Sequence, residues 1–184
     1  MKTVFNINNL DTRQQPLFLG QPLALQRYDR LKYPKLFELA EKMEEYFWRP
    51  QEVPLLKDRN DYLELTDSER FVFDTNLKWQ TMTDSMLSRS LMKIGEHVTN
   101  PELEAAINVW AFFESNIHSR SYSHILKNVY PNESVFWDSI LQDQEVVSRA
   151  NEAKKEYDKL FTPTDDVRQQ IFNALLATQV TEGL

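Results

Sequence analysis

An unbroken run of helical spacing over residues 67–94 constrains the fold of this chain more than any other feature. Thr66 and Glu69 have the spacing of a capping box, which predicts that a helix opens at this point. Gly95 predicts where the helix ends, because glycine readily adopts the backbone conformation that closes a helix. The apolar positions that recur at helical spacing are Phe71, Phe73, Leu77, Met82, Met86 and Leu87. A helix of this length predicts a helical bundle.

The rest of the chain carries similar signals and few signals for β structure. Only three glycines and eight prolines occur in 184 residues, which leaves little material for the turns of an all-β protein. Asn100 before Pro101 predicts the start of a second long helix. The expected helices are 34–48, 67–94, 101–128, 134–142, 144–160 and one from 165 onward, with an irregular stretch at 51–65. We therefore predict an all-α fold, with residues 1–33 as an extended arm and residues 34–184 as the bundle.

Composition excludes several classes of function. The net charge of −7 disfavours nonspecific binding to nucleic acid. No stretch approaches the roughly 20 apolar residues of a membrane span, and the N-terminus lacks the pattern of a signal peptide, so a cytoplasmic location is expected. The sequence has no cysteine, which excludes disulfides and thiolate metal sites. Any metal must be held by carboxylates and by the three histidines, His97, His118 and His124.

Several polar residues stand where core residues are expected. Asp84 lies in the first long helix, and Glu114, His118 and Tyr122 follow one another at four-residue spacing in the second, so that these three share one broad face. Glu182 lies in an otherwise apolar segment near the end of the sequence. Carboxylates and imidazole pointing into a helical bundle suit a di-iron or di-manganese centre.

The same residues allow a plainer interpretation. A lone aspartate on a helix is usually solvated, and a Glu–His pair at four-residue spacing is commonly a surface pair. Trp48 is equally compatible with a core aromatic at a helix end. Composition and periodicity leave both interpretations open.

Longer blocks of sequence carry a resemblance to a known family. They are Phe18-Leu19-Gly20-Gln21-Pro22, Arg27-Tyr28-Asp29, Phe47-Trp48-Arg49-Pro50-Gln51-Glu52-Val53, Asn76-Leu77-Lys78-Trp79-Gln80-Thr81 and Ile117-His118-Ser119-Arg120-Ser121-Tyr122-Ser123-His124-Ile125. In this order they resemble the N-terminal half of the small, radical-bearing subunit of class I ribonucleotide reductase, in the branch typical of enteric bacteria and their large phages. The resemblance implies a ferritin-like helical bundle that is incomplete at its C-terminus.

The resemblance also implies roles for individual residues. Asp84 and His118 match ligands of one metal ion, and Glu182 matches the first carboxylate of the second half-site. Tyr122 matches the tyrosine that stores the radical, and Trp48 matches the tryptophan that passes it towards the large subunit. The implied cofactor is dinuclear iron, with manganese or a mixed centre as alternatives.

One departure from the family pattern concerns the bridging glutamate. The family places it three residues before the histidine, whereas Glu114 lies four residues before His118, and a gapless match puts Ser115 in the ligand position. A π-bulge absorbs such an insertion and would return Glu114 to the metal. We therefore predict an irregular helix between Phe113 and His118, with Glu114 as the favoured ligand. A variant site with altered or absent metal is the alternative.

A second departure is the absence of the family's second Glu-x-x-His pair. A split gene, an intron or a truncated record would each explain it. The expected partners are a complementary C-terminal half, the large subunit, and a second copy in a homodimer. The expected activity is that of a ribonucleoside-diphosphate reductase subunit, an oxidoreductase that is inactive without these partners. The alternatives are a non-catalytic helical fragment that binds its other half or the large subunit, and, more weakly, a related di-iron oxidase or ferritin-like store.

Overall fold

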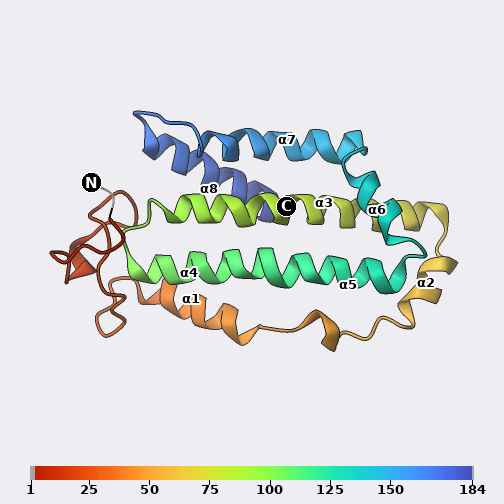
Figure 1. Cartoon of the computed structure of the whole chain (residues 1–184), viewed down its shortest axis with the longest axis horizontal. Helices are drawn as coiled ribbons and strands as arrows, with labels where there is room; N and C mark the ends of the chain where they lie inside the picture. Colours follow the sequence, from red (N-terminus) through yellow and green to blue (C-terminus); the bar gives the residue numbers. More distant parts are fainter. Residues whose placement is uncertain (1–2, 184) are drawn as a thin grey trace. The chain divides into compact units, whose positions relative to one another are not determined.

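The structure, a computed structural model, describes residues 3–183 and is dominated by helices (Figure 1). In this range the only extended pairing is one isolated bridge between Phe18 and Val98. The predicted all-α class is therefore confirmed. Met1, Lys2 and Leu184, the outermost residues of the two predicted segments, lie outside the described residues. No helix in the described part combines the length and apolarity needed to cross a membrane.

The chain forms two compact units, one from residues 1–47 and 91–112 and the other from residues 48–90 and 113–184. The helices are α1 (Pro34–Glu45), α2 (Asp58–Glu64), α3 (Asp67–Gly95), α4 (Pro101–Phe112), α5 (Ser119–Val129), α6 (Glu133–Ile140), α7 (Gln144–Lys159) and α8 (Val167–Gly183). The shorter elements are η1 (Thr12–Gln14) and η2 (Pro50–Glu52), which are 3-10 helices, and η3 (Phe113–His118), which is a π-helix.

The predicted helix starts are confirmed by their capping hydrogen bonds. The Thr66 N–H donates to the Glu69 carboxylate at 2.9 Å, and the Glu69 N–H donates to the Thr66 hydroxyl at 3.3 Å, which completes the capping box of α3. Asn100 accepts from the Leu103 N–H at 3.0 Å and caps α4 in the predicted way. Local side-chain chemistry therefore fixes where these helices begin.

Two expectations were wrong. The stretch expected to be irregular contains α2, a two-turn helix whose Tyr62 is buried and anchors it to the core. Most residues of this helix are polar or charged, so the sequence shows no apolar period that would predict it. In addition, α1 ends at Glu45, so Phe47 lies outside it and is half exposed. The Tyr46 and Phe47 N–H groups bond instead to carbonyls three residues earlier, which tightens and closes the last turn.

In the first unit, α1 packs against α4, and the buried Glu102 ties the preceding arm to the pair. Its carboxylate accepts hydrogen bonds from the backbone N–H groups of Lys32 at 2.6 Å and Tyr33 at 3.0 Å, and from the Asn100 side chain at 2.6 Å. Burial alone would raise the pKa of Glu102, but these hydrogen bonds outweigh it and lower the pKa. The chain entering α1 is thus held by a buried carboxylate.

We expect Glu102→Gln to lower the free energy of unfolding by about 1–3 kcal/mol, because a buried, charge-assisted acceptor is replaced by a weaker one. The folded-state pKa of Glu102 is depressed, so its contribution is present above the unfolded-state pKa and lost as the pH falls through the folded-state pKa. Chemical denaturation at neutral and acidic pH measures both effects. The control is Glu104→Gln, which weakens an exposed hydrogen bond that the Glu104 carboxylate accepts from the Gln26 side chain. Equal losses in the two variants would contradict the prediction.

In the second unit, α5 contacts α2, η2 and α6, and α7 packs along α8 (Figure 1). Its core gathers buried residues from several helices: Tyr62, Leu77, Leu126, Val129, Tyr130, Phe136 and Ile140. Asp143 caps α7 by accepting from the Val146 N–H, and it also pairs with Lys78 of α3 at 3.1 Å. This unit contains every residue to which the sequence assigns a site.

Candidate metal centre

Asp84 and Glu114 are carboxylates buried inside the second unit. Asp84 lies on α3 and is 6% exposed, and Glu114 lies on η3 and is 2% exposed. Two ionised carboxylates without a nearby cation are costly at such depth, because little water remains to solvate them. The pair therefore requires a positive partner.

The π-helix η3 places Glu114 and His118 on the same side of the backbone. It spans Phe113–His118, the interval in which the departure from the resembled family's spacing predicts an irregular helix, so that prediction is confirmed. The Ser119 hydroxyl donates to the Glu114 carbonyl at 2.8 Å, and thus bonds a carbonyl within the widened turn. The extra residue is absorbed locally, as π-bulges at functional sites absorb insertions.

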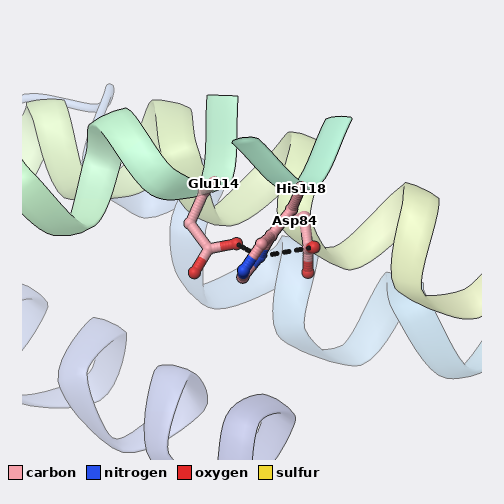
Figure 2. Close-up of side chains that lie close together, drawn as sticks. All are labelled: Asp84, Glu114 and His118. Carbon is pink, nitrogen blue, oxygen red and sulfur yellow. Dashed lines mark hydrogen bonds and ion pairs between the residues drawn. The ribbon is translucent and has the colours of Figure 1, made fainter. Parts of the chain in front are cut away.

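His118 joins the two carboxylates (Figure 2). Its Nδ1 lies 2.8 Å from Glu114 Oε2 and 3.2 Å from Asp84 Oδ2. One ligand atom from each of the three residues lies within 4.8 Å of the other two. The hydrogen bonds to Asp84 and then Glu114 raise the pKa of His118 to about 10, despite the opposing effect of burial. A protonated imidazole therefore supplies the positive charge beside the two carboxylates.

Ser115, the other candidate for the ligand position, lies at the surface. Its side chain is exposed and accepts a hydrogen bond from its neighbour Asn116 at 2.9 Å. Glu114 and Ser115 are the two candidates for the ligand position. The Glu114 side chain points at His118, whereas Ser115 lies at the surface.

Tyr122 lies one turn beyond His118 on α5, and its hydroxyl donates a hydrogen bond to Asp84 Oδ2. The side chain is partly buried and packs against the core of the second unit. Burial raises the pKa of Tyr122, and the hydrogen bond to the Asp84 carboxylate raises it further. The phenol is therefore neutral and points at a carboxylate that accepts protons.

Trp48 and Glu182 lie near the same cluster. The Trp48 ring centroid is 5.8 Å from that of His118 and 6.0 Å from that of Phe113. Glu182, near the end of α8, is exposed, yet partial desolvation and the charges of Glu114 and Asp84 raise its pKa to about 7. Glu182 therefore lies close enough for its charge to interact with both carboxylates.

Sequence reasoning missed Ser119 as a supporting residue. A serine directly after His118 carries no signal in itself, since a hydroxyl in a helix usually bonds a carbonyl four residues back. Here the acceptor is five residues back, because the turn is π-helical. This five-residue separation between the hydroxyl and its acceptor can be expected only once the π-helical turn is known.

We expect Ser119→Ala to lower the free energy of unfolding by about 1 kcal/mol, because it leaves the Glu114 carbonyl without this hydrogen bond. Amide hydrogen exchange should quicken in η3 more than elsewhere in the chain. The matched control is Ser123→Ala on the same helix, whose exposed hydroxyl bonds to the Ser119 carbonyl at 3.2 Å in ordinary four-residue spacing. Equal exchange in η3 for the two variants would show that Ser119 does not support the bulge.

An all-helical chain with carboxylates and an imidazole gathered between its helices is of the ferritin-like class, and a solved structure supports this assignment. A ribonucleotide reductase R2 subunit from Clostridium botulinum matches with a TM-score of 0.88 and 26% identity, covering 100% of this chain and 57% of that one. A second solved structure, a putative class I ribonucleotide reductase from Bacillus halodurans, matches with a TM-score of 0.73 and 25% identity, covering 82% of this chain and 54% of that one.

Sequence comparison identifies the family. The family described as ribonucleotide reductase, small chain, matches residues 26–184. The ribonucleoside-diphosphate reductase subunit beta of Haemophilus influenzae is 41% identical over 159 residues, which are 86% of this chain and 42% of that protein. The corresponding subunit of Enterobacteria phage T4 is 36% identical over 168 residues, 89% of this chain and 42% of that one. This chain belongs to the ribonucleotide reductase small-chain family, and it spans about two fifths of the length of these relatives.

Proposed function

We propose that this chain is the part of a ribonucleoside-diphosphate reductase small subunit that holds one half of a dinuclear metal centre and the tyrosine oxidised by that centre. The observation that carries the proposal is the meeting of Asp84, Glu114 and His118, with the Tyr122 hydroxyl bonded to Asp84. A non-catalytic fragment requires no such arrangement of buried polar groups. The geometry therefore favours the competent centre over that alternative.

The donor set fits the metals of this class. Oxygen and imidazole ligands suit iron and manganese, and the mutual distances within 4.8 Å suit atoms that share one ion. Asp84, Glu114 and His118 would hold the first ion, and Glu182 would supply a carboxylate to the second. When bound, the iron or manganese pair supplies the oxidising power to remove one electron from a tyrosine.

The side chains around the centre have distinct tasks in this proposal. Asp84 accepts the hydrogen bond of Tyr122 and receives its proton when the phenol is oxidised. The core residues packed against Tyr122 keep water away from the resulting radical. Trp48, in ring contact with His118, provides the next aromatic group towards the surface of the second unit. Tyr122 thus stores the oxidising equivalent and Trp48 passes it on.

A complementary polypeptide would complete the site. A groove of about 1030 Å³ in the second unit is bordered by α3, α7 and α8. Its walls include exposed apolar side chains: Phe71, Val72, Leu176 and Val180. Exposed apolar area of this kind is typical of an interface. We propose that the groove receives the C-terminal half of the small subunit, which would bring the remaining glutamate and histidine ligands.

The further partners follow from the family. A large subunit would bind the ribonucleotide and supply the reducing thiols, because this sequence has no cysteine. A second copy of the assembled small subunit would form the homodimer. Residues 34–184 would form the partial bundle in this assembly, and residues 1–33 its arm. The net reaction is reduction of a ribonucleoside diphosphate to its deoxyribonucleotide.

The direct test compares the purified chain with the chain co-expressed with its C-terminal half. Metal affinity depends on the number of ligands and on the groups that orient them. We therefore expect weak, substoichiometric iron binding by the chain alone, and two ions per site with a tyrosyl signal in electron paramagnetic resonance when both halves are present. Two tightly bound ions on the isolated chain would contradict the proposed division of ligands.

Variants in the co-expressed protein separate the roles. Tyr122→Phe should abolish the stored radical and leave the metal content unchanged, whereas His118→Ala should reduce the metal content itself. The control is Tyr157→Phe, another buried tyrosine, whose hydroxyl bonds only to threonine hydroxyls in the contacts described. A stored tyrosyl signal of the same shape and amount in Tyr122→Phe would refute the assignment of Tyr122.

A further inference from the structure

Two buried tyrosines of the second unit share one carboxylate, that of the partly buried Asp74. Tyr62 on α2 and Tyr130 at the end of α5 are each 8% exposed. The Tyr62 hydroxyl donates to Asp74 Oδ1 at 3.1 Å, and the Tyr130 hydroxyl donates to the same oxygen. The two ring centroids are 4.7 Å apart. Three helices thus bring two phenols and one proton acceptor into contact.

We propose that Tyr130 is a second oxidisable tyrosine, with Asp74 as its proton acceptor, and that it supplies an electron to oxidised Tyr122. The proposal rests on the proposed function only for its oxidant, the Tyr122 radical. The site lies outside the cluster of Asp84, Glu114 and His118, and none of its three residues is needed to hold a metal.

The hydrogen bond to Asp74 provides what oxidation of a buried phenol requires. Burial raises the pKa of Tyr130, and the hydrogen bond to the Asp74 carboxylate raises it further, so the phenol is neutral in the resting protein. A neutral phenol must lose a proton when it loses an electron, because a charged radical is costly in a core. The Asp74 oxygen already holds that hydrogen bond, so the proton needs to move only along it.

The charges around the pair favour Tyr130 over Tyr62 as the oxidised residue. The Arg70 guanidinium carbon lies 5.3 Å from the centroid of the Tyr62 ring. A cation over a ring is attracted to its electrons and therefore opposes their removal. Tyr130 instead packs against the uncharged ring of Phe136 at 4.8 Å. Tyr62 serves as the second hydrogen-bond donor that keeps Asp74 in place.

The path to Tyr122 runs along one helix. Tyr122 and Tyr130 are eight residues apart, which corresponds to about 12 Å along α5. Tyr122 also packs directly against the core cluster that includes Tyr62 and Tyr130. In the transfer, an electron passes from Tyr130 to the Tyr122 radical while the Tyr130 proton moves to Asp74. Tyr122 regains its own proton from Asp84, so the products are a neutral Tyr122 phenol and a neutral Tyr130 radical.

The first test needs no metal and therefore does not depend on the proposed function. The metal-free 184-residue chain, in a Tyr122→Phe background, is oxidised by flash photolysis with a ruthenium polypyridyl complex and persulfate. Ascorbate then removes radicals from exposed tyrosines, and the sample is frozen for electron paramagnetic resonance. We expect a persistent tyrosyl signal that is lost in Tyr130→Phe and in Asp74→Asn, and retained in Tyr62→Phe and in the control Tyr157→Phe.

The variants are chosen so that a folding defect cannot imitate the result. Asp74→Asn keeps the shape of the side chain and a hydrogen-bond acceptor but cannot take the proton, and circular dichroism with thermal unfolding verifies each variant. The absence of a persistent signal in the parent chain would overturn the proposal. A signal that survives both Tyr130→Phe and Asp74→Asn, or that disappears equally in Tyr157→Phe, would overturn it as well.

The second test addresses the link to Tyr122 in the co-expressed, iron-loaded protein. Tyr130→Phe should lengthen the lifetime of the Tyr122 signal, because its electron donor is removed, and Tyr157→Phe should leave the lifetime unchanged. An unchanged lifetime in Tyr130→Phe would refute the transfer. If no Tyr122 signal forms in the parent protein, the proposed function fails, while the photolysis result still decides whether Tyr130 is oxidisable.

Discussion

Asp84 and Glu114 are buried carboxylates whose charge the second unit must balance. Two carboxylates at this depth are stable only beside a cation, and in the metal-free chain His118 provides that charge with its raised pKa. Metal binding would replace the imidazolium proton by an ion that both carboxylates and the neutral imidazole ligate. The Asp84 carboxylate also positions Tyr122, whose hydroxyl donates a hydrogen bond to it.

The π-helix connects this electrostatic requirement to the sequence. Glu114 and His118 are separated by one residue more than in the pattern that the sequence resembles, and in the π-helix Glu114 Oε2 lies 2.8 Å from His118 Nδ1. The bulge absorbs the extra residue, and Ser119 bonds the Glu114 carbonyl within it. This hydrogen bond offsets part of the free-energy cost of the widened turn. The backbone remains helical in α4, before the turn, and in α5, after it.

Features encoded locally could be predicted from the sequence, and those that depend on distant contacts could not. The capping box at Thr66 follows from spacing alone, and the irregular turn before His118 follows from comparing the spacing with that of the resembled family. The structure has both. Helix α2 is held to the core by one buried residue, Tyr62, and its sequence therefore shows no apolar period. Likewise, the spacing of Tyr62, Asp74 and Tyr130 does not predict that they meet. Their shared hydrogen bonds form only when three separate helices pack together.

We propose that Asp84, Glu114 and His118 together ligate one metal ion across the π-turn. Crystals of the co-expressed halves soaked in Mn²⁺, with anomalous scattering measured at the manganese edge, test it most directly. We expect an anomalous peak bonded to all three residues, with η3 still π-helical and Ser115 turned to solvent. A peak that excludes Glu114, or a regular helix that presents Ser115 to the ion, would contradict it.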